Sequence, residues 1–594
     1  ISEGDGSGIS VKASENNIIN DNYIWSNAGK GIEIYNSGNT TIINNYITLN
    51  MEGGIYLNMD SGNNTIEKND LINNGYSGIF IYAGSGNSIL SNTIGNTGDI
   101  RLPNSAGTEK KMPDIIARVF ELQVPVLYSS EGIQLMGVTE TEILSNTVNR
   151  CTNYGIRMDG IVVIDSSGGS LDTTFYVPEA IHIKSNFFEE NGINDITLYN
   201  AHSAIIEENF MQYSGSGIYG RGLSKINPAL VDRDSIDRGD FIIRDNIFSY
   251  IGHRDVRKIS SIQRPADGAI LLSDLQTAHI YNNKIMNSGG GMYLASITQA
   301  FVYSNNLNSL NYRGVDAYQI DSCVIHDNNL SNTVESGIYI YNYFDVNRGP
   351  DINYIDIYQN TISNIQGNAI GCDLVDHLAI TKNTITNVEQ VGISTSDCKE
   401  SYIKNNTVSG CTAPSLLVQN TPLVNINLNQ FINPSGLGMP SVQFAYLGKA
   451  SISENLISDA TENGIVSNYV DTLLLKENQI ISCNGFGCNF GGSQLIQMIR
   501  NEIHGNINGA YFFESDSIIL DANTISGNRM GGLDLNTNHY CLISNNYIME
   551  NKRNGIQVNV MDTCIVQNNY IADNGYGYMT SDPGGQKQLC NSQY

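Results

Sequence analysis

Two aspartates stand where a strand would present them to solvent. Asp316 lies in GVDAYQID and Asp373 in AIGCDLVD, and in both segments apolar residues alternate with the aspartate position, as in a strand with one buried face. If the two strands lie two repeat turns apart, their backbones are about 9.6 Å apart. Depending on whether the side chains lean together or apart, the distance between their carboxyls can then fall within roughly 5 to 9.5 Å. This range includes the carboxyl separations of both retaining and inverting glycosidases. We therefore expect Asp316 and Asp373 to be the catalytic acid and the base or nucleophile of glycoside hydrolysis.

Outward positions in the neighbouring repeats carry side chains suited to sugars. Tyrosine rings stack on sugar rings and their hydroxyls form hydrogen bonds, while arginine forks bind carboxylate or sulfate groups. Ordinary outward strand tyrosines would give the same pattern, so a purely structural role stays open for them. The expected substrate-binding residues are Arg157, Asp159, Tyr199, Tyr219, Arg221, Tyr293, Tyr318, Tyr339 and Tyr341.

The stretch from Arg221 to Arg264 is basic in an acidic chain. It holds nine Lys and Arg against six Asp and Glu, whereas the whole chain has a formal net charge of −27. This favours an acidic, uronate-containing polysaccharide as substrate, although ion pairs within the loops would account for it equally well. His253 with Arg254 and Arg257 could neutralise a uronate and remove its C5 proton, the chemistry of a lyase. These three residues join the expected substrate contacts, and a lyase ranks second to a hydrolase.

A repeat of about 23 residues must position these side chains. Asn-x-apolar triplets such as NYI, NDL and NTI recur in 21 copies, and most of them are 22 to 24 residues apart. Each copy opens with a Gly-led alternating segment such as GIYIYN, continues with a second apolar segment and the Asn, and ends with a short third apolar segment. Three short strands per repeat predict an all-β fold, a single-stranded right-handed parallel β-helix (a solenoid) of about 21 rungs. The recurring Asn is expected to be a stacked turn residue.

These repeat features carry a family resemblance. The Gly-Ile-x-Val/Ile strand and the Asn-x-Ile turn resemble the parallel β-helix repeats of pectin-lyase-like and NosD-like proteins, over residues 10–575. The resemblance implies the fold, and no motif identifies an individual family within it. Because this fold hosts lyases, hydrolases, epimerases, tailspikes and adhesins, it leaves the activity open. The Asp-Pro-His-Asp motif of alginate epimerases is absent from the sequence.

Interruptions of the repeat predict how the chain is organised. We expect one β-helix domain over residues 1–594, in which the N-terminal half carries long loop insertions and the later turns are plain. Since the insertions flank the first strand of each turn from both sides, they predict a walled groove from about Gly132 to Asp373 that suits an extended polymer. The alternative is that they cover an oligomer contact. The predicted parts are a decorated, groove-bearing half (92–373), plain rungs (374–575) and a C-terminal cap or tail (576–594), with insertions at 98–130, 160–178, 222–240, 252–267 and 343–352.

Composition limits the partners. The net charge and a pI near 4.5 argue against nucleic acid or anionic membranes as partners, and no apolar stretch is long enough to span a membrane. The ten cysteines lack zinc-site spacing and are expected to be buried thiols. No cofactor is predicted, although Asp-rich loops could hold calcium. Nothing at Ile1 resembles a signal peptide, and the chain is expected to be a processed product.

Two classes of function follow from these features. The favoured one is an extracellular or cell-surface enzyme that cleaves a polysaccharide, acting as a monomer or a homotrimer. The alternative is a non-catalytic carbohydrate-binding surface module, such as a viral tailspike, an adhesin or a cell-envelope fibre. Neighbouring carboxyls on the floor of an open groove would favour the enzyme, whereas acids splayed into solvent would favour the module.

Overall fold

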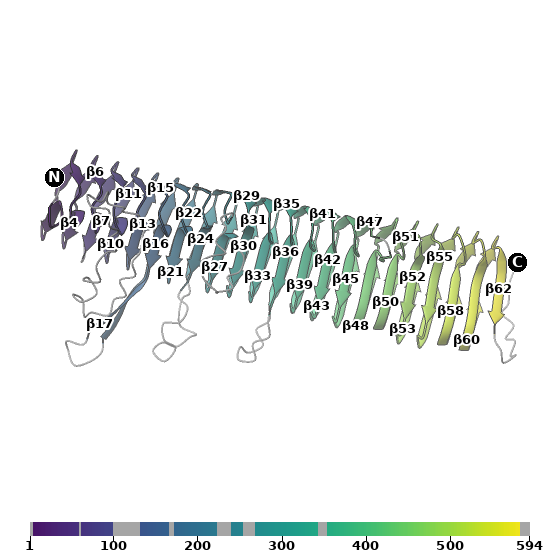
Figure 1. Ribbon diagram of the computed structural model, residues 1–594. Helices are drawn as coiled ribbons and strands as arrows, with labels where there is room; N and C mark the ends of the chain where they lie inside the picture. Colours follow the sequence, from purple (N-terminus) through teal and green to yellow (C-terminus); the bar gives the residue numbers. More distant parts are fainter. Residues whose placement is uncertain are drawn as a thin grey trace, which may run out of the picture. The chain divides into compact units, whose positions relative to one another are not determined.

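The computed structural model shows turn after turn of short parallel strands (Figure 1). Every element in the described part of the chain is a β-strand. The chain divides into two compact units, residues 1–290 and 291–594, called unit 1 and unit 2 below. The structure describes residues 4–58, 61–98, 131–165, 172–222, 239–252, 268–342, 353–436 and 438–581.

In unit 1 each turn contributes three short strands. One such turn consists of β7 (Gly53–Asn58), β8 (Thr65–Glu67) and β9 (Asp70–Ile72). The first strand of the next turn, β10 (Ser77–Tyr82), pairs in parallel and in register with β7. Second and third strands stack on their counterparts in the same way. Each position of a turn therefore forms a column of equivalent residues that runs through the unit.

Unit 2 follows the same plan with longer third strands. A typical turn has β36 (Ile338–Tyr341), β37 (Tyr354–Tyr358) and β38 (Thr361–Ile365), and the third strand has five residues instead of three. Further along, the first and second strands merge into one strand of 12 residues, as in β48 (Val442–Ser453). The first, second and third strands keep their columns throughout these turns.

The interior consists of columns of aliphatic side chains. In β36, Ile338 and Ile340 are fully buried, while Tyr339 and Tyr341 face outward. Burying an isoleucine contributes roughly 1.5–3 kcal/mol, and its β-branched side chain suits extended backbone. The alternating pattern of the sequence therefore specifies which side of each strand becomes core.

Buried asparagines hold the turns together between the second and third strands. Asn383 accepts hydrogen bonds at its Oδ1 from the backbone and side-chain amides of Asn360, both at 3.0 Å. Its own Nδ2 donates to the Ile357 carbonyl at 2.8 Å and to the Asn406 Oδ1 at 3.0 Å. Because each asparagine repeats these bonds to the next turn, the column satisfies backbone groups that the tight corner would otherwise leave unpaired.

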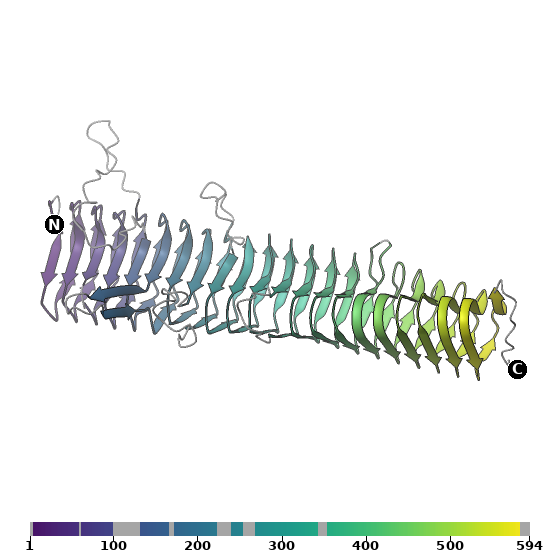
Figure 2. The same ribbon diagram turned by 90° about the horizontal axis from the view of Figure 1, so that it is seen from below.

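One predicted insertion has regular structure of its own. After β16 (Tyr154–Asp159), the chain forms an antiparallel pair, β17 (Ile161–Asp165) with β18 (Asp172–Tyr176). This pair projects away from the stacked turns (Figure 1), and its strands run at an angle to those of the turns (Figure 2). The other predicted insertions lie mainly outside the described residues, at 99–130, 223–238, 253–267 and 343–352.

The predicted all-β parallel solenoid of about 21 rungs is confirmed. The predicted buried thiols are confirmed for eight cysteines, while Cys564 is only partly buried and pairs in register with Cys541. No helix in the described part of the chain has the length and hydropathy needed to cross a membrane. The division into decorated half, plain rungs and tail stays a prediction.

The asparagine column should make a large contribution to stability. We expect Asn383→Ala to lower the free energy of unfolding by about 2–4 kcal/mol, because it leaves buried amides of Asn360 and the carbonyl of Ile357 without partners. The urea midpoint measures this change. Thr384→Ala, at an exposed position one residue further on, is the matched control and should leave the midpoint nearly unchanged; equal midpoints for the two variants would contradict the expectation.

Candidate functional site

The outward positions of the first strands in unit 2 bring several predicted residues together. β30 (Gly290–Ala295), β33 (Val315–Tyr318), β36 and β39 (Ile370–Asp373) pair in sequence. One outward column carries Tyr293, Asp316, Tyr339 and Gly371, and the other carries Ala295, Tyr318, Tyr341 and Asp373. The two predicted catalytic aspartates therefore lie two turns apart, as expected, but in different columns.

Asp316 is held by an arginine that precedes its strand. Arg313 Nη1 lies 2.9 Å from Asp316 Oδ1, and Arg313 Nε lies 3.5 Å from Glu335 Oε2. The Asp316 side chain is only 12% exposed, so it is not freely accessible at the bottom of an open groove. Burial raises the pKa of Asp316, and the charge of Arg313 opposes that rise.

Tyr339 connects this ion pair to Asp373. The Arg313 guanidinium lies over the Tyr339 ring at 4.0 Å from its centroid. At the far end of the ring, the Tyr339 hydroxyl donates to Asp373 Oδ2 at 2.7 Å. Gly371 makes room for the ring, because a Cβ at this position would lie 2.8 Å from Tyr339 Cδ2. Arg313 and Tyr339 thus form a continuous bridge between the two carboxyls.

The bridge gives the two carboxyls different environments. Burial raises the pKa of Asp373 and nearby Asp397 adds to the rise, while the Tyr339 hydrogen bond and Arg313 oppose it. Burial and the hydrogen bond to Asp373 raise the pKa of Tyr339 well above its usual value, so Tyr339 stays protonated and acts as a donor. Asp316 has a cation at hydrogen-bonding distance, whereas Asp373 has a neutral hydroxyl. Such a pair can divide into one ionised and one protonated carboxyl.

Sequence reasoning missed Arg313 and Glu335. Both residues precede the alternating segments. The sequence signal that could have found them is their position just before the Gly that begins each segment, Gly314 for Arg313 and Gly337 for Glu335. The remaining predicted tyrosines do lie beside the cluster. Tyr293 is next to Asp316 in register, and Tyr318 stacks on Tyr341 at 5.9 Å between ring centroids.

The predicted residues in unit 1 form a second, self-contained cluster. Arg157 Nε lies 2.8 Å from Asp159 Oδ2, and Arg157 Nη1 lies 3.5 Å from the fully buried Glu131. Arg157 also lies over the Tyr199 ring at 5.7 Å from its centroid. Two carboxylates already surround this guanidinium, so a substrate carboxylate would compete with them.

Other predicted contacts are placed less favourably or not described. Arg221 Nε pairs with Asp274 at 3.0 Å, and Tyr199 packs against Tyr219 with tilted rings at 5.3 Å between centroids. His253, Arg254 and Arg257 lie outside the described residues. Within the described residues, no group of three or more His, Cys, Asp and Glu side chains could hold a metal ion.

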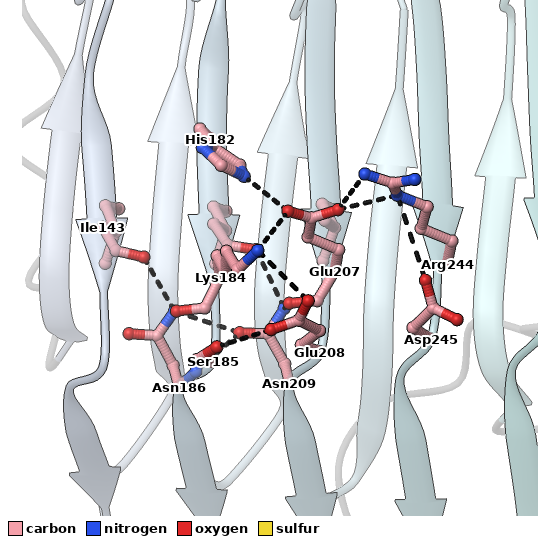
Figure 3. Close-up of polar contacts among 12 residues, drawn as sticks. Ile143, His182, Lys184, Ser185, Asn186, Glu207, Glu208, Asn209, Arg244 and Asp245 are labelled. Atoms are coloured by element: carbon pink, nitrogen blue, oxygen red, sulfur yellow. Dashed lines mark hydrogen bonds and ion pairs between the residues drawn. The ribbon is translucent and has the colours of Figure 1, made fainter.

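A third cluster lies on the second strands of unit 1 (Figure 3). Glu207, on β22 (Ser203–Glu207), accepts from His182 and Lys184 at 3.0 Å each and from Arg244 Nε at 2.6 Å. Burial opposes its ionisation, but these donors outweigh burial and lower the pKa of Glu207 to about 2. Since this carboxylate is 5% exposed and fully surrounded by donors, we interpret the cluster as structural.

Comparison with known proteins identifies the class. The chain belongs to the right-handed beta helix region family, whose model matches residues 1–160, 299–446 and 441–593, more than half of the chain. The predicted right-handed parallel β-helix is thereby confirmed. A search of curated proteins gives no match.

Three solved structures share features of this fold at low similarity. A double mutant of the periplasmic alginate epimerase AlgG is 14% identical, with 56% of this chain and 81% of that one covered and a TM-score of 0.31. The catalytic unit of a thermostable GH87 alpha-1,3-glucanase from Streptomyces thermodiastaticus is 11% identical (64% and 62% covered, TM-score 0.27). The A-module of the Azotobacter vinelandii mannuronan C-5 epimerase AlgE6 is 9% identical (76% and 91% covered, TM-score 0.21).

The Tyr339 hydrogen bond should hold down the pKa of Asp373. We expect Tyr339→Phe to raise that pKa further, because the donor that favours the ionised form is lost. A pH titration of carboxyl-labelled aspartate by NMR, assigned with Asp373→Asn, measures it. Tyr341→Phe, which removes a hydroxyl from the neighbouring column, is the control. An unchanged or lower Asp373 pKa in Tyr339→Phe would contradict this reading of the bridge.

Glu207 should make folding depend on pH in acid. Its pKa is lowered from 4.5 to about 2 on folding, so its contribution to stability is complete above pH 4.5 and is lost as the pH falls towards 2. We expect Glu207→Gln to unfold at a lower temperature than wild type at neutral pH, and the two midpoints to converge as the pH approaches 2. Glu208→Gln, half exposed and screened by solvent, should shift the midpoint much less. A constant gap between Glu207→Gln and wild type across this range would overturn the assignment.

Proposed function

We propose that the cluster of Asp316, Arg313, Tyr339 and Asp373 is the catalytic site of an extracellular glycoside hydrolase that cleaves a polysaccharide. The observation that carries the proposal is the bridge itself. Two carboxyls from different turns face the same side of unit 2, and Arg313 and Tyr339 link them through contacts of 2.9, 4.0 and 2.7 Å. A purely structural surface has no need of two half-buried carboxyls in such different environments.

The environments suggest how the two roles divide. Asp373, whose pKa is raised by burial and by Asp397, donates a proton to the leaving glycosidic oxygen. Asp316, which lies 2.9 Å from the cationic Arg313, in its ionised form either takes a proton from the attacking water or attacks the anomeric carbon itself. Water supplies the hydroxyl of the new reducing end and the proton that restores the acid. Tyr293, Tyr318 and Tyr341 offer hydroxyls and ring surfaces to the sugars on either side.

The basic stretch of the chain bears on the charge of the substrate. An acidic, uronate-containing polymer is favoured by the basic stretch between Arg221 and Arg264, much of which lies outside the described residues. Two of its described members are already paired, Arg221 with Asp274 and Arg244 with Glu207. Neutral polymers therefore belong in the same test.

A lyase and a non-catalytic module remain as alternatives. The raised pKa of Tyr339 makes it a poor base for removing a C5 proton, which favours hydrolysis at this cluster. A surface module would bind sugar without requiring either carboxyl. The oligomeric state, monomer or homotrimer, bears on this alternative. In a homotrimer, a threefold contact that covered the cluster would prevent a polymer from reaching the two carboxyls.

An activity screen tests the proposal. The protein is incubated with neutral and uronate-containing polysaccharides, and reducing ends and ultraviolet absorbance are read together. We expect new reducing ends without absorbance, and a loss of about 10²–10⁴-fold in rate for Asp316→Asn and for Asp373→Asn. Asp356→Asn is the matched control, because Asp356 is also partly buried with a raised pKa but lies on β37, outside the cluster.

Each other outcome points to a different class. Absorbance from unsaturated uronate would replace the hydrolase with a lyase and direct attention to His253, Arg254 and Arg257. Equal losses in all three variants, with lowered unfolding midpoints, would indicate a structural effect. Silence on every polymer with a folded protein would favour the non-catalytic module.

A further inference from the structure

A surface pocket of unit 2 lies on a different side of the turn from the candidate catalytic cluster. It spans four stacked third strands, β35 (Asn329–Thr333), β38, β41 (Thr384–Val388) and β44 (Thr407–Cys411), and the residues that follow them. These strands pair in register. The pocket has a volume of roughly 430 Å³ and is open to solvent. None of the predicted site residues lines it.

One wall of the pocket is a ladder of exposed side-chain amides. Asn332, Asn364 and Asn387 occupy equivalent positions with φ of 56°, 54° and 55°, in the left-handed region that Asn tolerates. Asn387 Nδ2 donates to Asn364 Oδ1, and Asn364 Nδ2 to Asn332 Oδ1, both at 3.3 Å. Asn332 Nδ2 donates a shorter bond, of 2.8 Å, to Asn308 Oδ1. The longer bonds leave the amides of Asn364 and Asn387 able to turn towards a ligand, and each amide offers donors and acceptors to hydroxyl groups.

The ladder stops because the next equivalent position is glycine. Gly410 has a φ of +68°, and a Cβ placed there would lie 3.1 Å from Asn387 Oδ1. Without a side chain at Gly410, no further amide caps Asn387 from that turn. The missing side chain also keeps this end of the pocket open, since Gly410 itself lines it.

The remaining lining is polar but carries almost no charge. Gln366, Glu389 and Thr412, all exposed, also line the pocket, together with the buried Val388 and Thr333. Glu389 is the only ionisable side chain among the lining residues. A cavity with several amides, a buried apolar side chain and a single negative charge suits a neutral, hydroxyl-rich ligand and disfavours an anionic one.

The pocket adjoins the catalytic cluster through the chain itself. Val334 lines the pocket, and the next residue, Glu335, pairs with Arg313. A ligand in the pocket therefore lies around one corner of the turn from Asp316. The columns of the pocket also run along the same direction as the outward columns of the cluster, since both follow the stacking of the turns.

We infer that this pocket is a second carbohydrate-binding site, specific for a neutral stretch of polysaccharide. The exposed amide ladder and Gln366 form hydrogen bonds with sugar hydroxyls, and Val388 supplies apolar contact beneath the ring. The site does not depend on the proposed hydrolysis, because none of its lining residues belongs to the carboxyl cluster. It would hold the polymer on the surface while the cluster acts.

Filling the open end of the pocket tests this inference. Gly410→Asn extends the amide ladder by one residue, fits the left-handed backbone and places a side chain in the pocket; only the flexible end of Asn387 must shift. Gly527→Asn is the matched control, because Gly527, like Gly410, is the fourth residue counted from the start of its third strand, has a φ of +60° and faces open space. Gln366→Ala removes a wall amide without touching the backbone.

Binding is measured by isothermal titration calorimetry in full-length protein carrying Asp316→Asn and Asp373→Asn, so that no probe is consumed. The probes are cellohexaose, laminarihexaose, maltohexaose and chitohexaose, with hexagalacturonate as the anionic comparison. We expect at least one neutral probe to bind, about tenfold weaker binding in Gly410→Asn and in Gln366→Ala, and unchanged binding in Gly527→Asn.

Three results would overturn the inference: no binding of any neutral probe, equal binding in Gly410→Asn and Gly527→Asn, or a preference for hexagalacturonate. If the wild-type protein hydrolyses no polysaccharide but the neutral probes still bind, the proposed function is contradicted and the second binding site is supported. If the wild-type protein hydrolyses a polysaccharide but Gly410→Asn does not change binding, the proposed function is supported and the second binding site is contradicted.

Discussion

In-register stacking of one turn on the next is the constraint on which the rest of this structure depends. Parallel pairing places each residue beside its counterpart in the neighbouring turns, so side chains of one kind form columns. Aliphatic columns fill the interior, and the buried asparagine column satisfies the corner between the second and third strands. A column position that suits one turn must suit the turns on both sides, which explains why the sequence repeats so regularly.

The candidate catalytic cluster and the surface pocket both lie where a column changes its residue. Asp316, Tyr339 and Gly371 follow one another in one outward column, and the small glycine allows the Tyr339 ring to reach Asp373 in the next column. Gly410 interrupts an exposed asparagine ladder in the same way and leaves a pocket open. At Gly371 the missing side chain makes room for a contact between neighbouring turns, whereas at Gly410 it leaves space at the surface.

Ion pairing distinguishes the three charged clusters. Glu207 is surrounded by donors and has its pKa lowered, whereas burial raises the pKa of Asp159 although Arg157 lies beside it. In the cluster around Asp316 and Asp373, burial raises the pKa of both carboxyls despite Arg313 and Tyr339. What sets the cluster of Asp316 and Asp373 apart is that Arg313 and Tyr339 link two such carboxyls from different turns.

The repeat, the β-helix and the face on which Asp316 and Asp373 lie could be predicted from the amino-acid sequence, because strand alternation and a 23-residue period depend only on local order. The sequence could not show that Asp316 is largely buried, that Arg313 and Tyr339 bridge the carboxyls, or that Arg157 is already paired. Those features depend on side chains from separate turns, on the length and direction of each side chain, and on the space left by Gly371 and Gly410. Only the tertiary structure decided them, because a column position gives the direction of a side chain but not the partner that it reaches.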